Sequence, residues 1–344
     1  YEEAISLCRQ KRFHEALEKC RYTSLDDEEE YSIDVIQPEK IEFKQNSYED
    51  GENSIISFPE FLLLVLDVCT GGEQPASHYQ PDKLIEKFDA LKTYFTAGEF
   101  YEKMLYYRLL LDYYTIRRDI KDGQGNYSLI LKGPKDDSDK LKQYQSMLYV
   151  STEAFYNWLK PYLRKLEQDE LHSCAEMLAF LKKGDNERHS ILPARKDLSY
   201  KASGNIRYWF WRLDYYLWEQ RSTFFNEEEQ KIVEHYVFRR NRSIEHLHPQ
   251  DESHNEEWEE EAVHSFGNLA MISQSFNSQQ SNDHIQIKFA RIHEQISNKS
   301  LQSIKMFLMC KLADFNYQNW TMKLAKEHEN EMIEFLERSF YISD

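Results

Sequence analysis

Two short motifs in the last third of the chain constrain its fold more than any other feature. The first is Glu-His-Leu-His-Pro-Gln at residues 245–250, and the second is Gly-Asn-Leu at residues 267–269, which Asn277 follows. The proline removes a backbone donor and so ends a strand, while the Gly-Asn pair is typical of a turn. The motifs therefore indicate short strands and turns inside a chain whose other segments read as helices.

The local pattern around the motifs predicts a strand, a long loop, a second strand and a helix. The first strand is expected at 236–239 or at 243–245, and the second at 269–272. A helix is expected from about 277 to 291, where polar residues suitable as N-caps precede an apolar pattern. In such a hairpin laid across a helix, the end of the first strand meets the first turn of the helix.

The side chains that this arrangement brings together suit the hydrolysis of a phosphodiester. The reaction needs a base that takes a proton from water, a cation near the developing charge and a fixed phosphate. His246 is suited to be the base, because an imidazole has a pKa of about 6.5. Glu245 and Asn277 offer oxygen ligands to Mg²⁺, a hard ion that keeps several waters. Asn268 is expected to fix the loop and to orient His246 by hydrogen bonding.

Other polar residues near the motifs are candidates for substrate contacts. Arg240, Arg242 and His248 are expected to hold the scissile phosphate or its neighbours. His248 is also an alternative metal ligand. Three further residues are expected on the surface or in the packing of the hairpin, with a phosphate contact as the alternative: His264, His284 and Lys288.

The composition fits a mostly helical protein that is long enough for two domains. Hydrophobic residues make up 41% of the 344 residues and aromatic residues 14%, with only 10 glycines and 8 prolines. Residues 23–57 are acidic and aperiodic and are expected to be a mobile loop, and 127–132 is expected to be a short strand. The expected helices lie at about 1–22, 58–69, 82–97, 99–120, 137–166, 168–183 and 204–221. The last of these is rich in aromatic residues and is predicted to be central to the core.

The net charge of −17 bears on the partner of the chain. Proteins that bind nucleic acids usually carry a basic footprint, whereas here the basic residues gather only locally, as at 239–242. A locally positive site on an acidic body is expected, without long-range attraction of the whole chain to DNA. The five scattered cysteines favour a reducing cytoplasm, and no apolar run has the length of a membrane span.

Both motifs resemble those of a known family. The segment is similar to the HNH nuclease domain of GmrSD-type restriction endonucleases, whose pattern is acid-His-Ile-x-Pro-Gln, then Gly-Asn-Leu, then Asn-Ser. It also resembles the HNH domain of RNA-guided DNA-cleaving effectors. The resemblance is close over about 236–292 and looser over 58–220.

The resemblance implies a role for each matching residue. His246 is the base, Asn268 is the structural middle residue, and Glu245 and Asn277 are ligands of Mg²⁺ or Mn²⁺. It further implies a ParB-like nucleotide-handling domain, which we expect before Tyr1 or on a partner chain. An oligomer, the DNA modification that is recognised and the choice between nicking and double-strand cleavage are left open.

The expected fold is mainly α with a small α+β element. An N-terminal helix and acidic loop at 1–57 precede a helical domain at 58–200. A ββα-metal (HNH, or His-Me finger) nuclease domain embedded in helices follows at 201–344, with its core at about 236–292. The expected function is a metal-dependent DNA endonuclease, the cleavage half of a restriction system against foreign or modified DNA. The alternative is a helical interaction or regulatory module that carries a catalytically inactive HNH fold.

Overall fold

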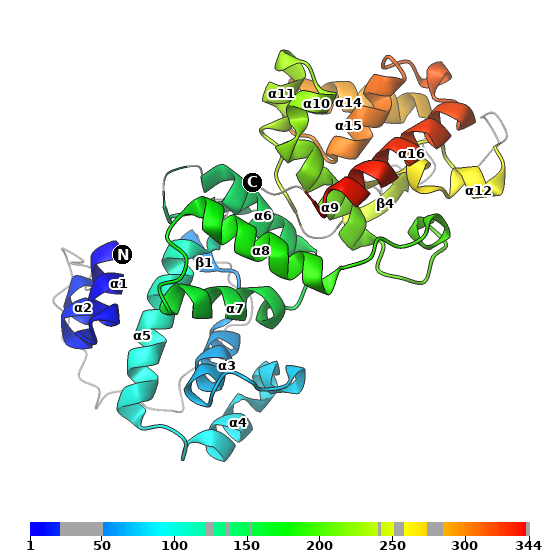
Figure 1. Cartoon of the computed structure of the whole chain (residues 1–344). Helices are drawn as coiled ribbons and strands as arrows, with labels where there is room; N and C mark the ends of the chain where they lie inside the picture. The colour runs from blue at the N-terminus through cyan, green and yellow to red at the C-terminus, as the bar shows by residue number, and fades with distance from the viewer. Residues whose placement is uncertain are drawn as a thin grey trace, which may run out of the picture. The chain divides into compact units, whose positions relative to one another are not determined.

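The computed structural model describes residues 1–20, 51–120, 127–134, 136, 138–151, 153–239, 242–250, 258–273 and 285–341. The chain is mainly helical with small antiparallel sheets, as predicted (Figure 1). It divides into two compact units: the first contains Tyr1–Lys135 and Phe155–Leu171, and the second contains Asp136–Ala154 and His172–Asp344. The domain boundaries expected after residues 57 and 200 remain predictions.

The first unit is built from helices around α3 (Phe58–Cys69) and α5 (Ala97–Tyr114). Each begins at a capping box, which in α3 joins Ser57 and Glu60. The two helices pack against each other, and α5 also packs against α7 (Phe155–Glu167). The other helices of this unit are α1 (Glu2–Arg9), α2 (Phe13–Cys20) and α4 (Leu84–Leu91), with the 3-10 helices η3 (Ala76–Tyr79) and η4 (Pro81–Lys83).

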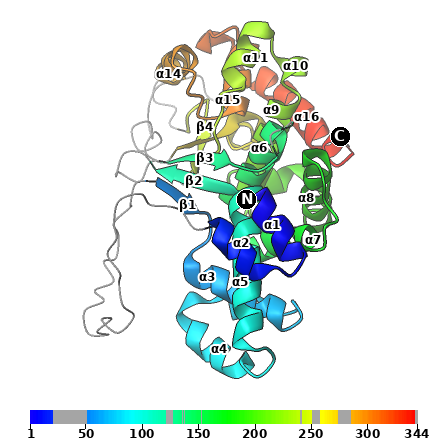
Figure 2. The ribbon, with the colours of Figure 1, turned by 90° about the vertical axis from the view of Figure 1, so that its left-hand side faces the viewer.

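A three-stranded antiparallel sheet completes the first unit (Figure 2). Strand β1 (Gly51–Ser54) pairs with β2 (Ile116–Ile120), which pairs in turn with β3 (Tyr127–Leu131). The strand predicted at 127–132 is therefore confirmed. The prediction of a loop at 23–57 is wrong at 51–54, which form β1, and residues 21–50 lie outside the described part of the chain.

The helix predicted at 99–120 ends early, at Tyr114, and is followed by its C-cap residue Thr115. The backbone of this residue is extended, with φ −121° and ψ 156°, and its hydroxyl donates to the carbonyl of Leu111 at 2.5 Å. The β-branched residues Ile116 and Ile120 then pair with β3. Pairing with two neighbouring strands overrides the helical pattern here, and a local pattern does not contain that information.

Other predicted helices are interrupted or shifted. The segment 1–22 forms two helices because Lys11 takes a left-handed φ of 59° between them. The segment 137–166 forms α6 (Ser138–Val150) and then α7. The segment 82–97 contains the end of η4, then α4, and the first residue of α5.

The second unit is organised around the aromatic helix α9 (Arg207–Glu219). Its aromatic side chains are buried, as predicted for a core helix. Helix α9 packs against α6, α15 (Ile304–Leu312) and α16 (Met322–Arg338). The other helices of this unit are α8 (Cys174–Arg188), α10 (Arg221–Phe224), α11 (Glu227–Val233), α12 (Glu260–Val263) and α14 (Ile285–Ser297), with η5 (Arg195–Leu198), η6 (Phe266–Asn268) and η7 (Tyr317–Asn319). Helix α8 begins later than the predicted residue 168 because Ser173 caps it.

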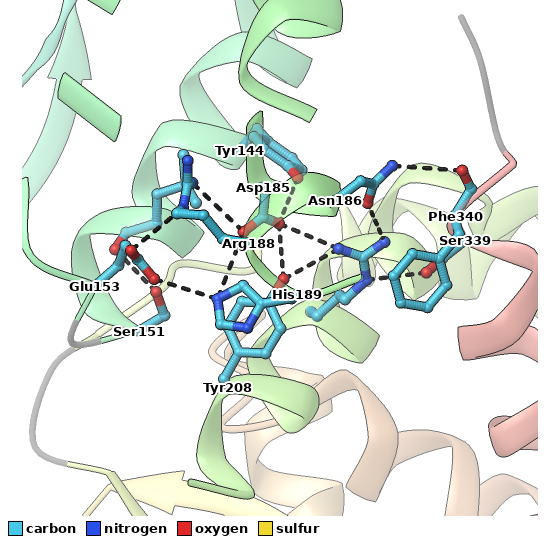
Figure 3. A network of polar contacts seen from close by, with 12 residues as sticks. Tyr144, Ser151, Glu153, Asp185, Asn186, Arg188, His189, Tyr208, Ser339 and Phe340 are labelled. Atoms are coloured by element: carbon cyan, nitrogen blue, oxygen red, sulfur yellow. Dashed lines mark hydrogen bonds and ion pairs between the residues drawn. The ribbon is translucent and has the colours of Figure 1, made fainter. Parts of the chain in front are cut away.

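A buried ion pair between Asp185 of α8 and Arg212 of α9 ties these helices together. Figure 3 shows Asp185 beside Tyr144 and Tyr208, which contact the same carboxylate. Nη1 of Arg212 lies 3.2 Å from Oδ2 of Asp185, and the hydroxyls of Tyr144 and Tyr208 donate to the same oxygen at 2.7 and 2.8 Å. Nε of Arg212 donates to the hydroxyl of Ser339 at 3.0 Å. Because each charge has several partners, its removal from water is compensated. The network therefore holds α6, α8, α9 and the end of α16 together.

A two-stranded antiparallel sheet lies in the second unit. Strand β4 (Arg242–His246) pairs with β5 (Leu269–Ser273), which packs against α9 and α15. Of the two positions predicted for the first strand, 243–245 is confirmed, and 236–239 is not a strand. Helix α14 follows β5, but the predicted helix start at 277 lies outside the described residues. No helix in the described part of the chain combines the length and the apolar character needed to cross a bilayer.

Candidate active site

The end of strand β4 carries Glu245 and His246. They pair with Ala270 and Leu269 of β5, and their exposed fractions are only 6% and 4%. Because consecutive side chains of a strand point to opposite faces, the two side chains have different surroundings. The imidazole and the carboxylate are therefore positioned by separate sets of contacts.

The imidazole of His246 is enclosed by polar and aromatic groups. Its Nε2 atom lies 3.0 Å from Nδ1 of His264, and its Nδ1 atom lies 3.0 Å from the side-chain amide nitrogen of Gln250. The ring of Tyr200 meets it at 60°, with 4.5 Å between the centroids. Burial, with a smaller effect of His264 and Lys288, lowers the pKa of His246 to about 3. The ring is therefore neutral at pH 7 and can accept a proton, and the same shift makes it a weaker base than a free imidazole.

The carboxylate of Glu245 forms a buried ion pair with Lys288 of α14. The ammonium group contacts Oε1 of Glu245 and also donates to the carbonyl oxygen of His246 at 2.5 Å. Of the two positions predicted for Lys288, the surface is wrong and packing against the hairpin is confirmed, with two oxygens of β4 compensating the burial of its charge. A signal existed in the sequence: Lys288 lies on the same helical stripe as the buried Ile285 and Ile292.

His264 is a second residue whose role the sequence did not reveal. It is buried, and its ring contacts His246. Its carbonyl oxygen accepts hydrogen bonds from the backbone N–H of Tyr200 and the hydroxyl of Ser199, both at 3.0 Å. It follows α12 in the connection between the two strands, where no regular spacing relates it to His246.

Asn268 fixes the loop that follows β4. Its Oδ1 atom accepts from the backbone N–H of His248 at 2.8 Å and from Nε1 of Trp320 at 3.2 Å. Its Nδ2 atom donates to the carbonyl oxygens of His248 and Val263, both at 2.9 Å. These bonds hold the main chain on both sides of the connection between the strands. Within the described part of the chain, the amide of Asn268 does not bond to the ring of His246.

Gly267 allows Asn268 to reach this position. A Cβ atom on Gly267 would clash with the carbonyl oxygen of Ala325 and would lie 2.8 Å from Cβ of Glu329, both in α16. The glycine therefore lets η6 lie directly against that helix. This close approach explains the glycine of the Gly-Asn-Leu motif.

The other predicted site residues are less fully described. His248 is buried and stacks on Trp258, with 4.1 Å between the ring centroids and 5° between the planes. Arg242 is the first residue of β4. Three predicted residues lie outside the described part of the chain: Arg240, Asn277 and His284.

The oxygen atoms at the end of β4 are of the type that binds hard cations. Oε1 of Glu245 and the carbonyl oxygen of His246 already converge on one positive charge, the ammonium group of Lys288. Mg²⁺ and Mn²⁺ prefer oxygen ligands of this type. The described residues contain no group of three or more His, Cys, Asp or Glu side chains that could hold a metal ion. Glu245 and Asn277 therefore stay predicted ligands.

The comparison with known protein families agrees with the motifs. Residues 186–335 match the family described as GmrSD restriction endonucleases, C-terminal domain. The match includes β4, β5, α14 and all the predicted site residues. No match was found among curated proteins or among solved structures. Residues 186–335, somewhat less than half of the chain, are therefore similar to the C-terminal domain of GmrSD restriction endonucleases, the family that the sequence motifs resemble.

Proposed function

We propose that the chain is a divalent-metal-dependent DNA endonuclease that hydrolyses phosphodiester bonds. It would act as the cleavage half of a restriction system against foreign or modified DNA. One observation carries this proposal: a buried His246 directly follows Glu245 at the end of β4, within a segment that matches a restriction endonuclease family.

In the proposed reaction, His246 is the general base. A neutral imidazole that accepts the proton of a water molecule makes that water a stronger nucleophile toward phosphorus. Glu245 and Asn277 would hold Mg²⁺ or Mn²⁺, which when bound supplies positive charge near the phosphate and the leaving oxygen. Asn268 would keep the loop after β4 in place, as its bonds to the main chain of His248 and to Val263 support.

The proposed contacts to the phosphates involve basic residues near β4. We assign them to Arg240 and Arg242, with a smaller share for His248 because its ring is buried against Trp258. Such contacts position DNA without reading its sequence. Recognition of a modification, and its control by a nucleotide, would then belong to the ParB-like domain that the resemblance implies.

A specific observation supports the alternative, a regulatory module with an inactive HNH fold. Lys288 already compensates the charge of Glu245, so this carboxylate is satisfied without a metal ion. The net charge of −17 also favours a partner other than DNA. The two functions make opposite predictions for metal-dependent cleavage.

Plasmid cleavage tests the proposal directly. The protein is incubated with supercoiled plasmid and Mg²⁺ or Mn²⁺, and parallel samples contain EDTA. We expect cleavage that EDTA stops, and a loss of about 10²-fold or more in His246→Ala, since a general base contributes about 10² to 10⁴. His235→Ala removes an exposed histidine of the same unit and is the matched control. A His246→Ala variant that folds and cuts at the wild-type rate would disprove the assignment.

The metal ligands need a separate experiment. Glu245→Gln and Asn277→Ala should raise the concentration of Mn²⁺ at which cleavage is half-maximal and leave DNA binding unchanged. Binding is measured by fluorescence anisotropy in EDTA, and cleavage across a Mn²⁺ titration. Unchanged titration curves in both variants would exclude them as ligands.

A further inference from the structure

Among the described residues, Gln250, Tyr200 and His264 contact the ring of the proposed base, and they come from different parts of the chain. Gln250 belongs to the same motif as His246, Tyr200 follows η5, and His264 follows α12. Asn268, which the sequence predicted to orient the ring, bonds instead to the main chain of the loop and to Trp320. Orientation of the ring therefore depends on residues outside the Gly-Asn-Leu motif.

We propose that His264 is a positioning residue for the proposed nuclease reaction, because its Nδ1 atom holds the imidazole of His246 in one orientation and one tautomer. The proposal rests on the proposed function for its consequence in catalysis. The contact itself is independent of that function: Nε2 of His246 and Nδ1 of His264 are 3.0 Å apart.

The geometry of this pair restricts where the protons lie. A neutral imidazole has one N–H donor and one acceptor nitrogen. At pH 7 an imidazole with the ordinary pKa of about 6.5 is mostly neutral. A hydrogen bond between two neutral rings requires one donor and one acceptor nitrogen, so the tautomer of one ring determines that of the other. Gln250 does not select the tautomer by itself, because its side-chain amide nitrogen lies 3.0 Å from Nδ1 and 3.3 Å from Nε2 of His246.

The structure holds His264 firmly enough for this role. Its carbonyl oxygen accepts from Tyr200 and from Ser199, and its N–H donates to the carbonyl of Glu260 at 3.2 Å. The Tyr200 ring also stacks on the ring of His264, with 5.8 Å between the centroids and 17° between the planes. The same tyrosine meets His246 edge-on, so the three rings form one packed group.

Three substitutions of His264 separate hydrogen bonding from packing. Asn places an amide group where Nδ1 stands, whereas Gln places it about where Nε2 stands, and Ala removes the hydrogen-bonding group. If the Nδ1 contact is what matters, His264→Asn should behave like the wild type and His264→Gln like His264→Ala. His235→Ala is again the control for the loss of a histidine elsewhere in the unit.

The first measurement needs neither metal nor DNA. Long-range ¹H–¹⁵N spectra distinguish the two tautomers of a neutral histidine by the shifts of the ring nitrogens, and His246→Ala assigns the signals. We expect one tautomer of His246 in the wild type and in His264→Asn, and a mixture in His264→Ala and His264→Gln. A single unchanged tautomer in all four folded proteins would overturn the proposal.

The second measurement links the contact to the reaction. In plasmid cleavage, kcat should fall by about 10- to 100-fold in His264→Ala, part of what a general base contributes, while KM stays within about twofold. His264→Asn should keep most of the rate. A tautomer mixture with an unchanged kcat would overturn the positioning role. Absence of cleavage by the wild type would instead count against the proposed function, and the spectra would still decide whether His264 holds the ring.

Discussion

Lys288 on helix α14 forms a buried ion pair with Glu245 on strand β4, and only 3% and 8% of the two side chains are exposed. The same ammonium group donates to the main-chain carbonyl of His246. One cation thus joins the helix to the strand and compensates the carboxylate that we propose as a metal ligand. A divalent ion at Glu245 and the ammonium of Lys288 would therefore share the same oxygen atoms.

The substitution Lys288→Met tests this relationship. It removes the charge, keeps an unbranched side chain and leaves Glu245 buried without its cation. Loss of one partner of a buried pair costs about 3 to 5 kcal/mol, so we expect a marked fall in the free energy of unfolding in EDTA. Mn²⁺ should restore part of this stability, because an ion that binds only the folded state stabilises it.

Thermal and urea unfolding in EDTA and in Mn²⁺ measure the effect. Lys323→Met is the matched control, since 85% of its side chain is exposed and its ion pair with Glu327 is long, at 3.8 Å. Equal stabilisation of wild type and Lys288→Met by Mn²⁺ would contradict competition between the two cations.

Gly267→Ala should destabilise the second unit. The added Cβ would meet the carbonyl oxygen of Ala325 in α16, and backbone atoms cannot move aside as a flexible side chain can. Overpacking of this kind costs about 1 to 3 kcal/mol. Gly204→Ala is the control, because a Cβ there has no atom within 4 Å. Urea unfolding of both variants provides the comparison, and equal stabilities would show that α16 does not pack tightly on η6.

Titration of the buried Lys305 should make the free energy of unfolding depend on pH. Its buried ammonium donates to the carbonyl oxygens of Phe266 and Leu269 at 2.8 and 2.7 Å, and burial lowers its pKa to about 7, although Asp214 and Glu329 oppose the shift. In the unfolded chain the pKa is about 10.4. Between these values the unfolded state binds a proton that the folded state has lost, so Lys305 makes the free energy of unfolding rise with pH.

The measurement is urea unfolding of the wild type and of Lys305→Met at several values between pH 7 and pH 9.5. The variant is expected to be less stable at each pH, because two buried carbonyl oxygens lose their donor. The free energy of unfolding of the variant should nevertheless rise less steeply with pH than that of the wild type. The two slopes should differ by up to about 1.4 kcal/mol per pH unit. Parallel curves would mean that Lys305 keeps its proton in the folded protein.

The motifs predicted the parts of the site that are local in sequence. The proline of the first motif and the Gly-Asn turn located β4 and β5, and the close packing of Gly267 on α16 explains why the turn contains glycine. Helix α3 was predicted at its observed bounds, because its apolar run is a local signal.

The parts that sequence reasoning missed depend on contacts between distant segments. The end of the helix predicted at 99–120 became β2 because it pairs with β1 and β3, and although the strand at β3 was predicted, its pairing with this segment is not visible in a local pattern. His264 lies in the connection between β4 and β5, where no periodic pattern relates it to its contact, His246. Lys288 is different: its stripe with Ile285 and Ile292 indicated burial, but only the structure shows that Glu245 is its partner.

The last prediction concerns DNA binding by residues 1–344 alone. Most non-specific affinity for DNA comes from neutralising phosphates with lysine and arginine, and this chain has a net charge of −17. We therefore expect weak binding that salt abolishes, with slow cleavage and little preference between modified and unmodified DNA. Selectivity should appear when a ParB-like nucleotide-handling domain is joined to the chain or added as a partner.

Fluorescence anisotropy with matched duplexes, one carrying modified cytosines and one unmodified, measures affinity across a series of salt concentrations. Cleavage of the same duplexes is followed in parallel. If phosphate neutralisation supplies the affinity, both duplexes should bind weakly and to a similar extent, and binding should be lost as salt increases. Tight binding that discriminates between the two duplexes would show that this chain itself reads the modification. The division between a recognising domain and a cutting domain would then be wrong, and the helices of residues 58–200 would be the first place to search for the reading surface.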